Sequence, residues 1–191
     1  MGRRERGAGM ENHQTTEQKR AIWQRVNPTL QPYPITAEQQ AAQDAVNVCC
    51  MGAKAQEDID VIRGFIEEEL SDRRGYLSYA AAAPTPNARQ IFRRLAAEEG
   101  GHARKLMGVY YLITGQVYCP ALPLPGKTCV PGWREVLRLR YHEESCGGLN
   151  YRRASEETSD ECLTEIFLEL SRDEYRHARQ ILCLLEKQMS I

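Results

Sequence analysis

The sequence has no long apolar run and almost no excess of charge. Its 191 residues carry 25 Lys and Arg against 26 Asp and Glu, a net charge of -1, so no strong field attracts nucleic acid or a membrane surface. No apolar stretch approaches the roughly 20 residues of a transmembrane helix. Residues 1–6 lead into polar sequence, so we expect no signal peptide. These absences predict a cytoplasmic protein that binds neither nucleic acid nor membrane.

Cysteine spacing excludes one kind of metal centre. The seven cysteines are an odd number, and none forms the Cys-x-x-Cys pair of a small iron or zinc site. In a cytoplasmic protein we expect free thiols, with Cys162 and Cys183 packed on the last helix. The adjacent Cys49-Cys50 pair is interpreted as two small buried side chains, although it could also form a thiol site. A disulfide between Cys119 and Cys129 stays open as well.

What the chain does have is one pattern of metal-binding residues twice. Glu99-x-x-His102 is followed by Ala-Arg, and so is Glu174-x-x-His177, 75 residues later. The same offset gives ten identities between residues 68–104 and 143–179, among them Glu69 with Glu144 and Tyr76 with Tyr151. We interpret these identities as an internal duplication of half a binding site.

Helix geometry explains why a Glu and a His three residues apart form a ligand pair. Residues at i and i+3 lie on one face of an α-helix, about a turn apart, so both side chains can bind one cation. One such motif arises easily by chance on a surface helix. Two of the four histidines fit it, however, and both carry the same flanking residues, so chance is a poor explanation.

The same geometry predicts two helical hairpins. A helix that rises from Glu69, turns at residues 84–87 and returns to Glu99 travels roughly 21 Å up and roughly 18 Å down. Glu69 and Glu99 then finish at nearly the same height. Glu144 and Glu174 are the same 30 residues apart in the second half of the chain. Each hairpin is therefore expected to bring two carboxylates and one imidazole to one level.

Residues 115–131 are expected to connect the two hairpins without a helix, because they contain four prolines. Extended, this 17-residue segment reaches roughly 50 Å, whereas a 27-residue helix is only about 40 Å long. It can therefore cross from one end of a bundle to the other and make the second and third helices parallel. The sequence predicts an all-α fold, a four-helix bundle whose halves are related by a pseudo-twofold axis.

The N-terminal part of the chain differs in composition. Residues 1–35 are polar and then rich in proline, and we predict a disordered or surface-bound arm. Residues 36–191 are predicted to form one domain, in which a short helical extension over residues 36–48 precedes the bundle.

With these motifs the chain resembles the ferritin-like di-iron carboxylate superfamily, in which two helices supply a Glu each and two supply Glu-x-x-His. Rubrerythrin is the most similar member. The resemblance covers residues from about 57 to 189 and implies a ferritin-like bundle with the long crossover between helices 2 and 3. It also implies the metal ligands: Glu99 and Glu174 bridge two ions, Glu69 and Glu144 are terminal carboxylates, and His102 and His177 bind one ion each.

The sequence departs from the rubrerythrin pattern in two respects. It lacks the Cys-x-x-Cys pairs of the rubredoxin domain, so electrons must come from an external donor such as a rubredoxin or a reductase. Rubrerythrins also tend to carry a second Glu one turn before the third-helix ligand, where this chain has Tyr141. A carboxylate that changes position with the redox state is therefore not expected.

Residues next to the ligands are harder to interpret. Tyr76 and Tyr151 follow the terminal carboxylates by two helical turns and can share the ligand face, where core packing is favoured over a proton relay. Glu98 and Asp173 precede the two motifs and could bind a ligand histidine, but a solvated helix face is the favoured interpretation. The Gly100-Gly101 pair indicates a close helix contact or space near the site.

The resemblance implies an oxidoreductase with two Fe ions that reduces hydrogen peroxide or dioxygen. Two Mn ions could take their place, because carboxylates with only two imidazoles suit either metal better than zinc or copper(I). A manganese catalase is the rival enzyme. Ferritin-like iron storage with ferroxidase activity is a second rival function, and a non-catalytic metal-binding scaffold is a third. We expect a homo-oligomer, in the simplest case a dimer.

Overall fold

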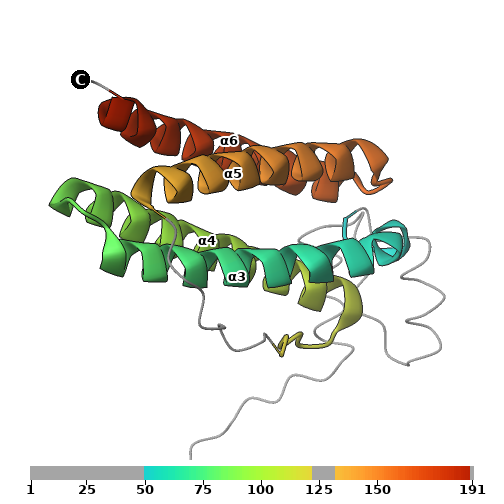
Figure 1. Ribbon diagram of the computed structural model, residues 1–191. Coiled ribbons are helices and arrows are strands. Elements are labelled where there is room, and N and C mark those ends of the chain that lie inside the picture. The colour runs from blue at the N-terminus through green and yellow to red at the C-terminus, as the bar shows by residue number, and fades with distance from the viewer. Residues whose placement is uncertain (1–49, 122–131, 190–191) are drawn as a thin grey trace, which may run out of the picture. The chain divides into compact units, whose positions relative to one another are not determined.

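The computed structural model describes residues 50–121 and 132–189, and these residues are almost entirely helical (Figure 1). A short 3-10 helix, η1, precedes four long α-helices. Their bounds are η1 Ala53–Asp58, α3 Ile59–Ala82, α4 Pro86–Thr114, α5 Trp133–Glu157 and α6 Glu161–Met189. No strand occurs in this part of the chain, which confirms the all-α prediction there. The predicted arm over residues 1–35 and the helical extension over residues 36–48 lie outside the described residues.

The turn between α3 and α4 follows from its prolines. Ala83 has the extended backbone (φ -61°, ψ 131°) that a following proline favours, so α3 ends there. Thr85 then caps α4, because its hydroxyl accepts a hydrogen bond of 3.1 Å from the Ala88 N–H. Pro86 occupies the first helical position, where its missing N–H costs nothing. At the far end, Gly115 takes the left-handed conformation (φ 68°) that commonly terminates a helix.

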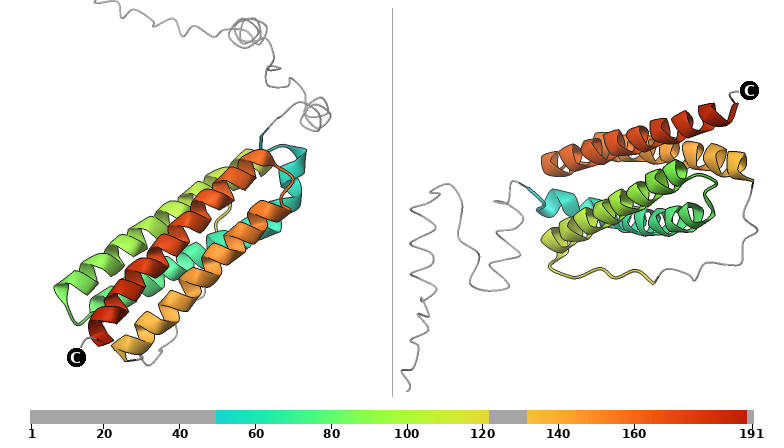
Figure 2. Two further views of the ribbon diagram at one scale, coloured as in Figure 1. Left: turned by 90° about the horizontal axis from the view of Figure 1, so that it is seen from above. Right: turned by 90° about the vertical axis from the view of Figure 1, so that its left-hand side faces the viewer.

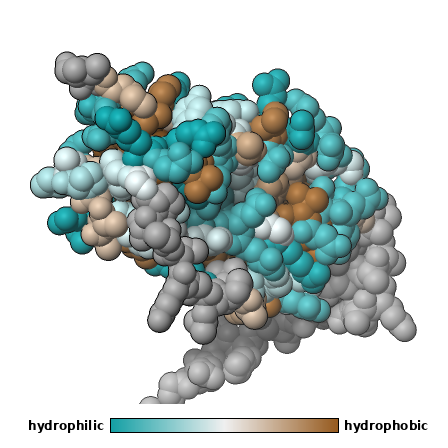
Figure 3. Space-filling view, in the orientation of Figure 1, coloured by the Kyte–Doolittle hydropathy of each residue, from teal (hydrophilic) through white to brown (hydrophobic). Residues whose placement is uncertain are grey.

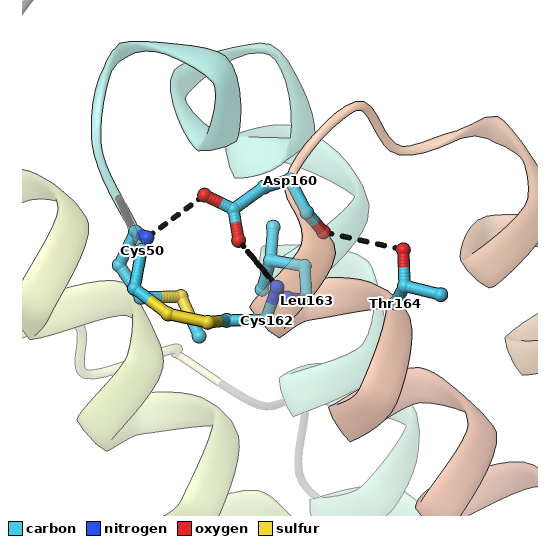
Figure 4. The surroundings of a disulfide bond; sticks show 6 residues. Cys50, Asp160, Cys162, Leu163 and Thr164 are labelled. Atoms are coloured by element: carbon cyan, nitrogen blue, oxygen red, sulfur yellow. Dashed lines mark hydrogen bonds between the residues drawn. A yellow bond between two sulfur atoms is a disulfide. The ribbon is translucent and has the colours of Figure 1, made fainter. Parts of the chain in front are cut away.

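Asp160 joins two segments at one end of the bundle. One of its carboxylate oxygens accepts hydrogen bonds from Cys162 N (3.0 Å) and Leu163 N (3.1 Å), which caps α6. The other oxygen accepts a hydrogen bond of 2.8 Å from Met51 N. The chain that enters η1 is therefore held against the start of α6 (Figure 4).

A disulfide links the same two segments, and it corrects the prediction of free thiols. Cys50 is bonded to Cys162, with their Cα atoms 5.6 Å apart (Figure 4). The expectation that Cys183 packs is also wrong, because its thiol is free and exposed. Cys119 is a free, exposed thiol too, whereas Cys49 and Cys129 lie outside the described residues. Sequence spacing could not pair Cys50 with Cys162, because 112 residues separate them.

The four helices lie side by side as a bundle of two hairpins, α3 with α4 and α5 with α6 (Figures 1 and 2). Hydrogen bonds pair Tyr76 with Glu144 and Tyr151 with Glu69, so residue numbers rise along α3 as they fall along α5. These two helices are therefore antiparallel, and α4 runs in the same direction as α5. The connection between α4 and α5 includes residues 122–131, so its predicted path across the bundle falls partly outside the described residues.

The apolar core is divided into two clusters, one toward each end of the bundle. One contains Phe65, Ile66, Leu106, Tyr151, Phe167 and Leu170, and the other contains Tyr76, Phe92, Leu95, Leu137, Ile181 and Leu184. Between them lies a layer of buried charged side chains, which is uncommon in a protein interior.

The visible coloured face of the bundle is mainly polar (Figure 3). On the face shown in Figure 3, hydrophobic side chains are scattered among hydrophilic ones. Within residues 50–121 and 132–189, no helix combines the length and the apolar character that a membrane crossing requires.

Candidate metal centre

The buried charged layer contains all six predicted ligands. None of them is more than 6% exposed. They form two groups of four, Glu69 with Glu99, His102 and Glu174, and Glu99 with Glu144, Glu174 and His177, and within each group the candidate ligand atoms lie within 4.8 Å of one another. Glu99 and Glu174 belong to both groups. The structure thus brings together every residue that the repeated motif singled out.

Each imidazole turns its Nδ1 atom toward the carboxylates. His102 Nδ1 lies 3.0 Å from Glu99 Oε2, 3.3 Å from Glu174 Oε1 and 3.4 Å from Glu69 Oε2. His177 Nδ1 lies 3.0 Å from Glu99 Oε1 and 3.2 Å from Glu144 Oε2. The two rings are stacked, with centroids 5.6 Å apart and planes inclined by 17°. Two equivalent half-sites therefore face each other across the centre of the bundle.

Several of these buried atoms lack the hydrogen bonds that burial normally requires. Both carboxylate oxygens of Glu99, Oε1 of Glu174 and Nδ1 of His102 make no hydrogen bond of good geometry among the described residues, although imidazole Nδ1 atoms lie 3.0–3.3 Å from these oxygens. These atoms face one another around Glu99 and Glu174, the two residues that both groups share. A divalent cation would satisfy such atoms, and four carboxylates with two imidazoles suit Fe²⁺ or Mn²⁺. The residues present therefore fit a dinuclear metal centre.

The other ring nitrogen of each histidine is held by a carboxylate from the opposite hairpin. His177 Nε2 lies 2.8 Å from Glu98 Oε2, and His102 Nε2 lies 3.3 Å from Asp173 Oδ2. Arg176 joins the two carboxylates, with bonds of 2.8 Å to Glu98 and 2.7 Å to Asp173. A carboxylate at Nε2 fixes the proton there and leaves Nδ1 for a metal. The favoured interpretation of Glu98 and Asp173 as a solvated helix face is therefore wrong.

Each tyrosine donates a hydrogen bond to a buried carboxylate of the other hairpin. Tyr151 donates to Glu69 Oε1 at 2.5 Å, and Tyr76 donates to Glu144 Oε1. Their rings are also buried in the core, so the predicted packing is confirmed but incomplete. Burial raises the pKa of both phenols well above the usual value, so the hydroxyls stay protonated and donate.

Arg140 is a buried site residue that sequence reasoning missed. It is 4% exposed, and its Nη2 donates to Glu144 Oε1 at 2.6 Å. Its Nη1 donates to Asp72 at 2.8 Å and to Glu143 at 2.6 Å. The rubrerythrin pattern points to position 141, one turn before Glu144, whereas the residue that binds Glu144 lies four positions before it. An Arg and a Glu at i and i+4 are a usual helical ion pair, and that spacing was the available signal.

The carboxylates of the centre have unequal proton affinities. Burial raises the pKa of Glu69 to about 7 and raises that of Glu174 well above its usual range. Burial acts on Glu99 in the same direction, but the imidazoles of His102 and His177 outweigh it and lower the pKa to about 2. The pKa of Glu144 is also lowered, because His177 and Arg140 outweigh the effect of burial.

The neighbouring carboxylates favour the protonated, positively charged form of both histidines. Burial would lower the pKa of His177, but Glu144, Glu99 and Glu174 raise it to about 11. The pKa of His102 is raised as well, by Glu174, Glu69 and Glu99 against the effect of burial. Without a metal, protons on the two imidazoles therefore neutralise much of the charge of the carboxylates. Divalent ions would do the same on replacing those protons.

Comparisons with protein-family models, with curated proteins and with solved structures return no match for this chain. The resemblance to the rubrerythrin di-iron domain therefore stays a prediction, which rests on the residues and their arrangement.

Proposed function

We propose that this protein is a dinuclear metal oxidoreductase of rubrerythrin type. The observation that carries the proposal is the pair of buried ligand groups that share Glu99 and Glu174. In the proposed centre, these two carboxylates would bridge two Fe ions. Glu69 and His102 would complete one ion's ligands, and Glu144 and His177 the other's. The parallel course of α4 and α5 supports a ferritin-like topology, with the connection between them as the crossover.

The bound ferrous pair would supply two electrons to hydrogen peroxide, which with two protons gives two molecules of water, or to dioxygen. Tyr76 and Tyr151 hold hydroxyl protons next to the terminal carboxylates and orient those carboxylates toward the centre. The two apolar clusters above and below the layer exclude bulk water. Because the sequence has no Cys-x-x-Cys pair, an external rubredoxin or reductase must return the electrons.

The donor set favours one second candidate. Carboxylates with two imidazoles suit Mn²⁺ as well as Fe²⁺, so a manganese catalase is the rival enzyme. It would need no external donor, because a second peroxide supplies the electrons. Ferritin-like iron storage has no particular observation in its favour. A non-catalytic metal-binding scaffold has no particular observation in its favour either.

An anaerobic titration separates these functions. Protein purified from its native source is first analysed for metals, where two ions per chain are expected. The reduced protein is then titrated with hydrogen peroxide. The proposal requires one equivalent consumed per centre without release of oxygen, followed by turnover only when a donor is added. Continued oxygen release without a donor would instead identify a catalase, a growing ferric mineral would identify storage, and metal-bound protein that consumes no peroxide would leave a scaffold. Metal-free protein would reject the proposed centre.

A further inference from the structure

The two halves of the internal repeat differ at a pair of positions that lies beside the centre. With the 75-residue offset, Arg140 of α5 corresponds to Phe65 of α3. Both lie against a tyrosine of the other hairpin: the Phe65 ring centroid is 4.1 Å from that of Tyr151, and the Arg140 guanidinium carbon is 4.5 Å from that of Tyr76. The two residues thus occupy equivalent places, but one is apolar and the other is a cation.

Because of this difference, the two terminal carboxylates, Glu69 and Glu144, accept different numbers of hydrogen bonds on the oxygen that faces away from the histidines. Glu69 Oε1 accepts one hydrogen bond, from Tyr151, and Glu69 Oε2 faces His102. Glu144 Oε1 accepts two, from Tyr76 and from Arg140 Nη2, and only Glu144 Oε2 faces His177. A guanidinium that donates to a carboxylate favours the ionised form, so the bound oxygen is less basic toward a second cation. Glu144 is therefore a weaker ligand than Glu69.

The neighbours of Arg140 hold it in this place. Its Nη1 binds both Asp72 and Glu143, whose side chains are 35% and 43% exposed. Asp72 has no equivalent in the second half, where the repeat has Gly147. The ion pairs therefore form on one side of the centre, and they fix the guanidinium on the Glu144 side.

We propose that Arg140 makes the two metal positions unequal, so that the Glu69 and His102 position binds its divalent ion first and the Glu144 and His177 position binds second. This inference rests on the proposed dinuclear centre. Mutation of a residue that hydrogen-bonds to a metal ligand typically costs about 10- to 100-fold in metal affinity. Arg140 is a cation, so its effect is expected to have that size and the opposite direction. We expect a difference of that size between the two positions.

The test is a titration of the metal-free full-length protein with Mn²⁺. Calorimetry measures the binding steps, and electron paramagnetic resonance reports whether the bound ions are isolated or paired. Two binding steps are expected, and the spectrum after one equivalent should show isolated Mn²⁺ ions. Arg140→Phe copies the other half of the repeat and should bring the two affinities within about threefold by strengthening the second step. Arg138→Phe on the same helix is the matched control, because Arg138 pairs with Glu135 at the surface and this substitution should leave both steps unchanged.

Two ligand variants show which position fills first. His102→Ala should remove the tighter step, and His177→Ala should remove the weaker one. They also keep the test valid if circular dichroism shows that Arg140→Phe does not fold. The inference is overturned by equal steps in the unaltered protein, by a folded Arg140→Phe variant with unchanged steps, or by the reverse assignment of the ligand variants. Absence of any Mn²⁺ binding in the unaltered protein would instead reject the proposed centre itself.

Discussion

The ring of Tyr175 lies against the backbone of Gly148, where a Cβ atom would come within 3.0 Å of it. Ser171 strengthens this contact between α5 and α6 by donating a hydrogen bond of 2.7 Å to the Gly148 carbonyl. The repeat gives the same contact in the first hairpin with the roles exchanged, since Gly100 corresponds to Tyr175 and Arg73 to Gly148. There a Cβ atom added at Gly100 would come within 3.0 Å of the Arg73 side chain. Each hairpin thus packs one large side chain against one glycine.

Gly148→Ala is therefore expected to destabilise the protein, although alanine favours helix by about 1 kcal/mol over glycine. A rigid aromatic ring cannot move away from the added methyl group as easily as a flexible side chain can, and such overpacking costs about 1–3 kcal/mol. Urea unfolding followed by circular dichroism measures the change. Gly64→Ala on α3 is the control, because a Cβ atom there meets nothing within 4 Å. It should stabilise by up to about 1 kcal/mol, and equal effects of the two substitutions would contradict this account.

The repeated motif was enough to predict which six side chains come together in the buried layer, because helical spacing fixes which side chains share a face. The repeat also indicated two hairpins of matched length. Arg140 was missed because an arginine in a helix is usually exposed, and its burial depends on how α3 packs against α5. Glu98 and Asp173 were misinterpreted for the same reason, since each binds a histidine of the opposite hairpin. The repeat therefore predicted which residues meet at the centre, whereas the hydrogen bonds that other side chains make between the hairpins could not be predicted.

Removal of the shared carboxylates should abolish metal binding. Glu99 and Glu174 belong to both ligand groups, so the double variant Glu99→Ala, Glu174→Ala removes two of the four ligands from each group. Elemental analysis should find close to no metal in it. His102→Ala should lose mainly one of two ions, because His102 belongs to one group. Glu135→Ala, a change outside both groups, serves as the control, and full occupancy in the double variant would reject the site.

The Cys50–Cys162 disulfide should stabilise the bundle by a few kcal/mol. It closes a loop of 112 residues between the start of η1 and the start of α6, and a loop of about 100 residues is worth up to about 4.7 kcal/mol in the chain-entropy treatment. Cys50→Ser or Cys162→Ser should therefore lower the free energy of unfolding by about 2–4 kcal/mol. Dithiothreitol should lower it by a similar amount in the unaltered protein and not further in the variants. The exposed Cys183 provides the control, and a Cys183→Ser variant as unstable as Cys162→Ser would argue against the bridge.

The metal-free protein should lose stability as the pH rises. The pKa of Glu69 rises on folding from 4.5 to about 7 and that of His177 from 6.5 to about 11, and those of Glu174 and His102 rise as well. The folded state then holds more protons than the unfolded state at every pH from about 5 to 9, so the free energy of unfolding falls with pH in that window. The lowered pKa of Glu99 acts in the opposite sense only below about pH 4.5.

From Glu69 alone the fall between pH 5 and 8 is on the order of 3 kcal/mol. Urea unfolding at pH 5, 6, 7 and 8 measures it, in the presence of a chelator. Glu69→Gln with Glu174→Gln should reduce the slope, because neither amide titrates. Bound Mn²⁺ should reverse the slope in the unaltered protein, since ligands must lose their protons to bind a metal and affinity rises with pH. If the metal-free protein becomes more stable toward pH 8, the folded state does not bind more protons than the unfolded state, and the account of raised pKa values is wrong.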